Sequence, residues 1–225
     1  MPCTQRDRNR TLAARASQAM NVRLVLPLKS LHEGKTRLAA ALSAKDRAAL
    51  IDRLLMHAIA QAAQFPGLEN TIVVTGCEWA RARAAQCGVG IIDEPTPGLN
   101  HALHRARRAV YEVGAEMMLV VPCDLPLLTA QDLRCLAAAA SADVIALAPD
   151  RAKRGTNGIC LPSSTALEFA FGEDSWVRHR TAIERLRLRT AEVERPGLVF
   201  DVDTVEDLAE LRSLEAQVLS PAGGR

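Results

Sequence analysis

Residues 117–128, with the sequence MMLVVPCDLPLL, combine a strand pattern with a polar turn. Five consecutive apolar residues at 117–121 are typical of a strand that is covered by side chains on both faces. The turn that follows carries one carboxylate, Asp124, between Pro122 and Pro126, and the two prolines restrict the backbone on either side of it. The pattern therefore predicts a stiff turn that presents Asp124 at the end of a buried strand.

Similar apolar runs alternate with helical patterns on both sides of this segment. Ser43 and Thr129 suit the N-caps of two of these helices. The alternation implies βαβ units, so we predict a Rossmann-like α/β domain with a mostly parallel central sheet covered by helices on both faces. The runs predict strands at 22–28, 71–75, 89–92, 117–121 and 143–148, and helices at 43–63, 78–86, 99–113 and 129–140.

The remaining sequence is less regular. A polar loop is expected at 149–157, followed by a strand at 158–161 and helices near 165–169, 177–188 and 205–214. Residues 1–20 are rich in arginine and are expected to form a disordered extension, which leaves 21–215 as the folded domain. Proline and glycine near the end predict a flexible tail at 216–225.

Composition excludes several function classes. The net charge is +2 and only 3% of residues are aromatic, so the chain offers few stacking platforms and no strong attraction for nucleic acid. The six cysteines form no C-x-x-C pair, and we expect them to be reduced and mostly buried. No run of about 18 apolar residues occurs, so we expect no membrane association and a cytoplasmic location.

A basic loop follows the first predicted strand. Two of the four lysines in the chain, Lys29 and Lys35, lie there together with Arg37, in the sequence PLKSLHEGKTRL at 27–38. In open parallel sheets, ligands bind beyond the carboxyl ends of the strands. Three cations beside Gly34 suit a triphosphate, because lysine supplies a compact charge and arginine a forked donor. The alternative is a solvated basic turn, since neither the P-loop pattern nor G-x-G-x-x-G is present.

Acidic residues stand at two places that suit a divalent cation. Asp124 follows a strand, and Asp201 and Asp203 are spaced by two residues in the extended sequence VFDVDT, so their side chains leave the same face. Such carboxylates suit Mg²⁺, which keeps several waters and joins one or two carboxylates to substrate phosphates. Asp203 also fits an N-cap role at the last helix, with Thr204 as the competing cap, and the two roles are compatible.

Six motifs, in this order, carry a resemblance to a known family. They are PLKSLHEGKTRLA (27–39), GLNHAL (98–103), PCDLPLL (122–128), APDRAKRGTNGICL (148–161), FGEDS (171–175) and FDVDTVEDL (200–208). Over about 21–214 the chain resembles the guanylyltransferases that activate 2-phospho-L-lactate, phosphoenolpyruvate or 3-phospho-D-glycerate for coenzyme F420 biosynthesis. These enzymes belong to the molybdenum-cofactor-guanylyltransferase-like nucleotidyltransferases. One departure is Val205, because a proline is common after D-x-D-T in this family.

The resemblance implies a nucleotidyltransferase domain that binds GTP and a small phosphorylated carboxylic acid. It implies that Lys29, Lys35 and Arg37 grip the triphosphate and, together with Asp124, serve catalysis. By the same comparison, the nucleotide pocket would also include Glu94, Gly98, Leu99 and Asn100.

The metal and acceptor sites follow from the same resemblance. Asp124 would hold Mg²⁺ together with Asp201 or Asp203. The resemblance does not distinguish which of the three acids is the acceptor. A homodimer is also compatible with it. Thr156, Gly172 and Ser175 match the positions that hold the acceptor in the family, although Ser175 also fits an N-cap role at the next helix.

Three alternative functions remain open from the sequence. Another enzyme of the superfamily would guanylate molybdopterin or a sugar phosphate. A non-catalytic nucleotide-binding regulator would bind a triphosphate without turnover, although the intact aspartates argue against it. A nucleic-acid-binding module would use the basic N-terminal segment and would show steep salt dependence.

Overall fold

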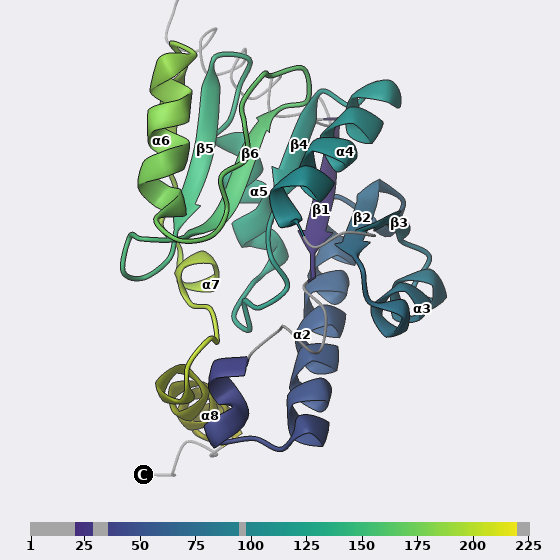
Figure 1. Ribbon diagram of the computed structural model, residues 1–225, viewed down its shortest axis with the longest axis vertical. Helices are drawn as coiled ribbons and strands as arrows, with labels where there is room; N and C mark the ends of the chain where they lie inside the picture. The colour runs from purple at the N-terminus through teal and green to yellow at the C-terminus, as the bar shows by residue number, and fades with distance from the viewer. Residues whose placement is uncertain (1–20, 29–35, 95–97, 220–225) are drawn as a thin grey trace, which may run out of the picture.

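A seven-stranded sheet forms the centre of the computed structural model, which describes residues 21–28, 36–94 and 98–219 (Figure 1). The strands are β1 (Val22–Pro27), β2 (Thr71–Thr75), β3 (Gly90–Asp93), β4 (Met117–Val120), β5 (Val144–Pro149), β6 (Thr156–Pro162) and β7 (Arg189–Glu192). Their order is β3-β2-β1-β4-β6-β5-β7, and every neighbouring pair is parallel except the two that involve β6. The predicted α/β fold with a mostly parallel sheet is confirmed.

Helices cover both faces of this sheet (Figure 1). One face packs against α2 (Ala44–Gln64), α3 (Glu78–Gln86) and α5 (Ala130–Ala138). The opposite face packs against α4 (Leu99–Glu112) and α6 (Ser175–Arg185). The shorter or peripheral helices are η1 (Thr36–Ala40), η2 (Leu68–Asn70), α7 (Pro196–Val199) and α8 (Val205–Leu219).

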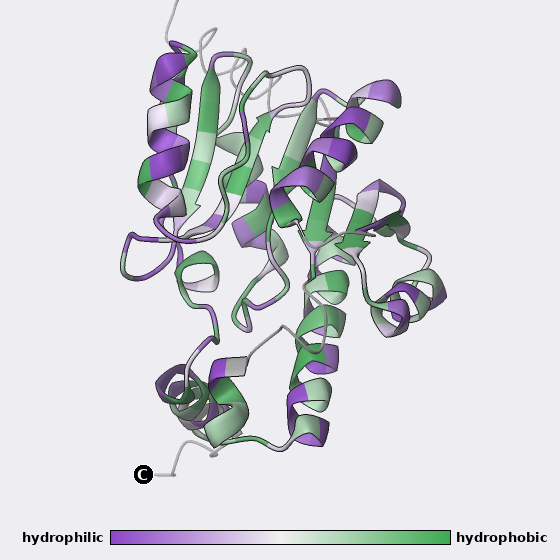
Figure 2. Ribbon diagram, in the orientation of Figure 1, coloured by the Kyte–Doolittle hydropathy of each residue, from purple (hydrophilic) through white to green (hydrophobic). Residues whose placement is uncertain are grey.

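The strands are apolar on both faces because helices cover both faces. All four residues of β4 are buried, with Met118, Leu119 and Val120 fully inaccessible to solvent. Figure 2 shows the central strands as hydrophobic, whereas the helices carry hydrophilic residues on one side. The continuous apolar run at 117–121 therefore predicted a central strand correctly.

Capping side chains set the start of two helices as predicted. The Ser43 hydroxyl accepts a hydrogen bond from the Asp46 N–H at 3.1 Å, and α2 begins at the next residue. Thr129 and Asp132 form a reciprocal capping box that starts α5. Because Thr129 caps α5, Asp124 has no capping role there.

The antiparallel direction of β6 matters for function. The parallel strands β1, β2, β3 and β4 all end at the same edge of the sheet, whereas β6 begins at that edge. Asn157 and Thr156, at the start of β6, therefore lie beside the segment that follows β4. The sequence placed both residues in a loop, and this boundary was wrong because β6 begins at Thr156.

A third apolar cluster lies beyond this edge. The first half of α2 extends past the sheet and packs against η1 and α8 through Leu38, Leu50, Leu54 and Leu208 (Figure 1). Phe200 and Val202 belong to the same cluster and anchor the chain before α8. This packing fixes the segment that carries Asp201 and Asp203 near the sheet edge.

Two local predictions were wrong. No helix forms at 165–169; burial alternates there because Leu167 and Phe169 are buried while Glu168 is exposed, a period that suits extended chain. The strand β7 was missed because its residues are mostly exposed and carry no apolar run. It pairs with β5 at the edge of the sheet.

The C-terminal helix is longer than expected. Helix α8 continues to Leu219, so 216–219, which were assigned to the tail, are helical. The predicted extension at 1–20 and the rest of the tail at 220–225 lie outside the described residues. None of the five described cysteines forms a disulfide, and only Cys123 and Cys160 are buried, so the expectation that most are buried was wrong. No helix in the described ranges combines the length and apolar character needed to cross a bilayer.

Candidate active site

A cleft of about 700 Å³ opens at the edge where the parallel strands end. Its lining includes residues from the ends of β1 and β5, from the turn after β4 and from the start of β6. Lys29 and Lys35 lie outside the described residues, and Gly98 and Asn100 lie beside the cleft, not on its lining. The predicted site residues that do line it are Arg37, Glu94, Leu99, Asp124, Thr156, Gly172, Ser175, Asp201 and Asp203.

One side of the cleft, the carboxylate wall, consists of Asp124, Asp201 and Asp203. The turn after β4 and the segment before α8 are joined by a hydrogen bond from the Val202 N–H to the Asp124 carbonyl at 3.2 Å. Asn157 donates from its side-chain amide to Asp201 Oδ1 at 3.3 Å. Residues far apart in the sequence are thus brought to one place.

The charges of the carboxylate wall repel one another. The pKa of Asp201 is raised to about 6, first by burial and then by the negative charges of Asp124 and Asp203. A divalent cation among these oxygens would relieve that repulsion, and the donor set fits Mg²⁺. Within the described residues, no three His, Cys, Asp or Glu side chains already form a metal site. A cation here would therefore take further ligands from water and substrate phosphates.

Thr204, not Asp203, caps the last helix. Asp207 Oδ2 accepts hydrogen bonds from the backbone N–H and the hydroxyl of Thr204, both at 2.8 Å. The Asp207 N–H in turn donates to the Thr204 hydroxyl at 3.2 Å. This reciprocal pair leaves the Asp203 side chain on the lining of the cleft.

The predicted nucleotide end of the cleft contains Arg37 and Glu94. Arg37 is exposed on η1 and lines the cleft. Glu94 Oε1 accepts a hydrogen bond from the Gly98 N–H at 2.9 Å, which joins the end of β3 to the start of α4. Gly76 is required here, because a Cβ would lie 2.6 Å from the Glu94 carbonyl oxygen. The sequence analysis did not identify Gly76.

The Asn100 side chain bonds to the backbone of Phe171 and does not line the cleft. Its side-chain amide donates to the Phe171 carbonyl at 3.1 Å, and its carbonyl oxygen accepts from the Phe171 N–H at 2.8 Å. Both ends of the amide are therefore bonded to one backbone position. Asn100 ties α4 to the loop that leads to Gly172.

The three predicted acceptor residues Thr156, Gly172 and Ser175 also line the cleft, and we call them together the acceptor wall. The Ser175 hydroxyl accepts a hydrogen bond from the Thr156 N–H at 2.9 Å. Ser175 is the first residue of α6, and the N-cap position belongs to Asp174, so the N-cap alternative for Ser175 was wrong. Gly172 has φ of 119°, which favours glycine.

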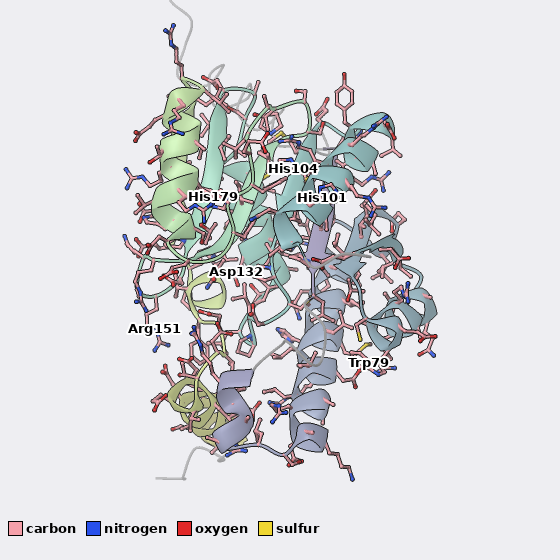
Figure 3. All side chains as sticks on the ribbon, viewed as in Figure 1. Trp79, His101, His104, Asp132, Arg151 and His179 are labelled. Carbon is pink, nitrogen blue, oxygen red and sulfur yellow. The ribbon has the colours of Figure 1, made fainter. Side chains whose placement is uncertain are left out.

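His179 supports the acceptor wall from behind and was not predicted. Its Nδ1 lies 3.0 Å from the Thr156 hydroxyl, and its Nε2 accepts from the Ala170 N–H at 2.9 Å. Burial, together with the nearby Arg178 charge, lowers its pKa to about 4, so the ring is neutral at pH 7. Figure 3 shows His179 on α6 beside the sheet. Its spacing four residues after Ser175 was the available signal, since such residues share a helix face.

Fold and cleft together define a class of protein. The structure resembles a nucleotidyl transferase from Methanothermobacter thermautotroptrophicus with a TM-score of 0.60 and 15% sequence identity, covering 88% of this chain and 98% of that chain. At that identity the likeness concerns the fold alone. The chain has the Rossmann-like α/β fold of nucleotidyltransferases.

Sequence relatives define the family. The chain belongs to the family described as "Guanylyl transferase CofC like", whose model matches residues 22–214. It is 37% identical over 196 residues to a phosphoenolpyruvate guanylyltransferase of Chloroflexus aggregans, covering 85% of this chain and 97% of the relative. It is 36% identical over 187 residues to one from Sphaerobacter thermophilus, covering 83% and 90%. The predicted family is confirmed, and the chain is a nucleotidyltransferase.

Proposed function

We propose that this chain transfers GMP from GTP to the phosphate of a small phosphorylated carboxylic acid and releases pyrophosphate. The supporting observation is that one cleft joins the carboxylate wall to the hydroxyl-bearing acceptor wall. Phosphoenolpyruvate is the first acceptor to test, because the two relatives named above are phosphoenolpyruvate guanylyltransferases. The other acids are 2-phospho-L-lactate and 3-phospho-D-glycerate, and the product would serve coenzyme F420 biosynthesis.

The reaction joins two phosphates. A phosphate oxygen of the acceptor attacks the α-phosphorus of GTP, and the bond from that phosphorus to the oxygen shared with the β-phosphate breaks. Pyrophosphate leaves with that oxygen and its electron pair. Because a phosphate monoester has a second pKa near 6, the attacking oxygen is already ionised at pH 7 and needs no general base.

Repulsion between the two anionic substrates is the main barrier, and positioning and charge neutralisation lower it. Arg37, with Lys29 and Lys35, holds the triphosphate of GTP. Asp124, together with Asp201 or Asp203, would hold Mg²⁺, and a bound cation would supply neutralisation of phosphate charge. Each of these groups reduces the cost of bringing the acceptor phosphate to the α-phosphorus.

The acceptor wall offers hydroxyl groups in fixed positions. Since His179 Nε2 accepts from a backbone N–H, Nδ1 carries the proton and donates to the Thr156 hydroxyl oxygen. The Thr156 hydroxyl proton is then available to the acceptor. The Ser175 oxygen likewise accepts from Thr156 N–H and leaves its own proton to donate. Both groups therefore present donors to an anionic acceptor.

Product analysis tests this function. Purified protein is incubated with GTP, Mg²⁺ and each acid separately, and the guanylated product is weighed by mass spectrometry while pyrophosphate is assayed. We expect a product with one of the three acids, and CTP and UTP in place of GTP should give far less. GTP binding without any product would favour the non-catalytic alternative, and a product only with molybdopterin or a sugar phosphate would favour another enzyme of the superfamily.

A further inference from the structure

We propose that Arg154 determines acceptor specificity by binding the carboxylate of the phosphorylated acid. The inference rests on the proposed function and adds a contact that the acceptor wall of hydroxyls and glycine does not provide. Arg154 lines the cleft immediately before Gly155 and Thr156. It is exposed, so its guanidinium can meet a ligand.

The charge of the cleft calls for such a group. Among its described lining residues, seven side chains are acidic and only Arg37 and Arg154 are basic. An acid with a phosphate and a carboxylate must enter this negative environment, and a cation on the acceptor side offsets the repulsion. Arg37 comes from η1, after the loop assigned to the triphosphate, so Arg154 is the cation placed for the acceptor.

The loop between β5 and β6 uses its other two cations elsewhere. Arg151 forms a two-fold ion pair with Glu210 of α8 at 2.8 and 2.9 Å, and Figure 3 labels its side chain on the side toward that helix. Lys153 pairs with Glu192 at 2.5 Å and also with Glu194. No hydrogen bond or ion pair of the Arg154 guanidinium forms with the described residues, so this one cation of the loop is uncommitted.

The backbone of Arg154 is nevertheless fixed. Its N–H donates to Asp150 Oδ1 at 2.8 Å, and its carbonyl accepts from the Trp176 N–H at 3.0 Å. These bonds hold the residue next to the Thr156 and Ser175 pair. The side chain therefore extends from an anchored point, and only its own rotamers need to be ordered when an acceptor binds.

Geometry favours the carboxylate over the phosphate of the acceptor. In the proposed reaction the phosphate of the acceptor faces GTP and the carboxylate wall. The carboxylate of the acceptor, at the other end of the small molecule, therefore points away from them. A guanidinium binds a planar carboxylate through two parallel hydrogen bonds, which a hydroxyl cannot do. Arg154 would thus distinguish a phosphorylated acid from a phosphate ester that lacks the carboxylate.

Kinetics of Arg154→Gln, with GTP saturating and phosphoenolpyruvate varied, test this assignment. Because hydrogen bonds to charged groups contribute about 1.5–3 kcal/mol, we expect the acceptor KM to rise about 10- to 100-fold while the GTP KM stays within about twofold. The acceptor KM of Arg154→Lys should lie between those of the wild-type protein and Arg154→Gln, since lysine keeps the positive charge but lacks the two parallel donors of the guanidinium. Arg178→Gln is the matched control, because Arg178 is exposed on α6 near the acceptor wall but does not line the cleft.

Ethyl phosphate, a competitor without a carboxylate, separates the two anionic groups. If Arg154 binds the carboxylate, the inhibition constant of ethyl phosphate against phosphoenolpyruvate should be within about threefold of the wild-type value in Arg154→Gln. The reason is that ethyl phosphate has no carboxylate and never makes the contact that the substitution removes. A parallel rise in that constant, or an equal effect of Arg178→Gln, would overturn the assignment. If wild-type protein converts none of the acids, the proposed function fails; if it does and Arg154→Gln keeps the wild-type KM, only this inference fails.

Discussion

The two walls of the cleft differ in charge and in how their polar side chains are hydrogen-bonded. On the carboxylate wall, burial and then the negative charges of Asp124 and Asp203 raise the pKa of Asp201 to about 6. Thr156 and Ser175 of the acceptor wall are buried and neutral, as is His179 behind them, and all three are bonded to one another or to the backbone. A bound cation would therefore stabilise the carboxylate wall, whereas the buried groups of the acceptor wall already have hydrogen-bond partners within the protein.

This contrast has a consequence for substitutions. On the carboxylate wall, removing a charge relieves repulsion and should leave folding intact while it removes function. On the acceptor wall, removing a buried polar group leaves its partner unsatisfied, which costs stability as well as binding. Activity, unfolding and ligand affinity of variants therefore test whether the two walls differ in this way.

Asp124→Asn should have the largest effect. Loss of a metal-binding carboxylate should lower kcat about a thousandfold, with the thermal unfolding midpoint unchanged or slightly higher. Pyrophosphate release and circular dichroism measure the two quantities. Glu173→Gln, which removes one exposed charge from the same cleft, is the control and should change kcat less than about threefold. Wild-type activity of Asp124→Asn at equal Mg²⁺ would refute the assignment.

The acceptor wall should respond to pH through His179. Its folded pKa of about 4 lies below its usual 6.5, so between these values the unfolded chain binds a proton that the folded chain does not. Stability from this group is complete above pH 6.5 and falls by up to about 3 kcal/mol as the pH drops to 4. Urea unfolding at pH 7 and 4.5 measures the loss. In His179→Gln the loss should be smaller, and an identical loss would contradict the prediction.

Arg37→Gln should weaken GTP binding about tenfold, because it removes a charge-assisted contact to the triphosphate. The same loss is expected for Lys35→Ala, since triphosphate contacts act in both the ground state and the transition state. Isothermal titration with GTP measures the affinity. Lys45→Gln is the control, since Lys45 is exposed at the start of α2 and does not line the cleft. Unchanged GTP affinity in both variants would mean that the basic loop is a solvated turn.

Thr156→Val and Ser175→Ala should show the smallest effects on catalysis. Each removes one hydroxyl donor, so the acceptor KM should rise about fivefold while the GTP KM is unchanged. Thr156→Ser keeps the hydroxyl and should restore the acceptor KM. Loss of GTP affinity with an unaltered acceptor KM would mean that the acceptor has been assigned to the wrong end of the cleft.

Local sequence patterns identified the residues of the carboxylate wall more directly than those in and around the acceptor wall. Asp124 was found because a buried apolar run ends beside it, and Asp201 and Asp203 because of their spacing. Thr156 was assigned to a loop, since nothing local shows that β6 runs antiparallel and begins at the cleft. His179 and Arg154 were missed because their roles depend on what other elements place beside them.

By itself the sequence determined the α/β fold, the strand-end position of Asp124 and the family. The fold and the position of Asp124 follow from local physics, since apolar runs and capping residues act over a few residues, whereas the family follows from the resemblance carried by the six motifs. The tertiary structure alone decided how the segments from β4, β6, α6 and the chain before α8 meet in one cleft. It also decided that Asn100 ties a loop and that His179 supports Thr156. Within the part of the chain that the structure describes, it decided too that the Arg154 guanidinium has no hydrogen bond or ion pair while Arg151 and Lys153 are paired. Such contacts join residues distant in sequence, so only the packed chain specifies them.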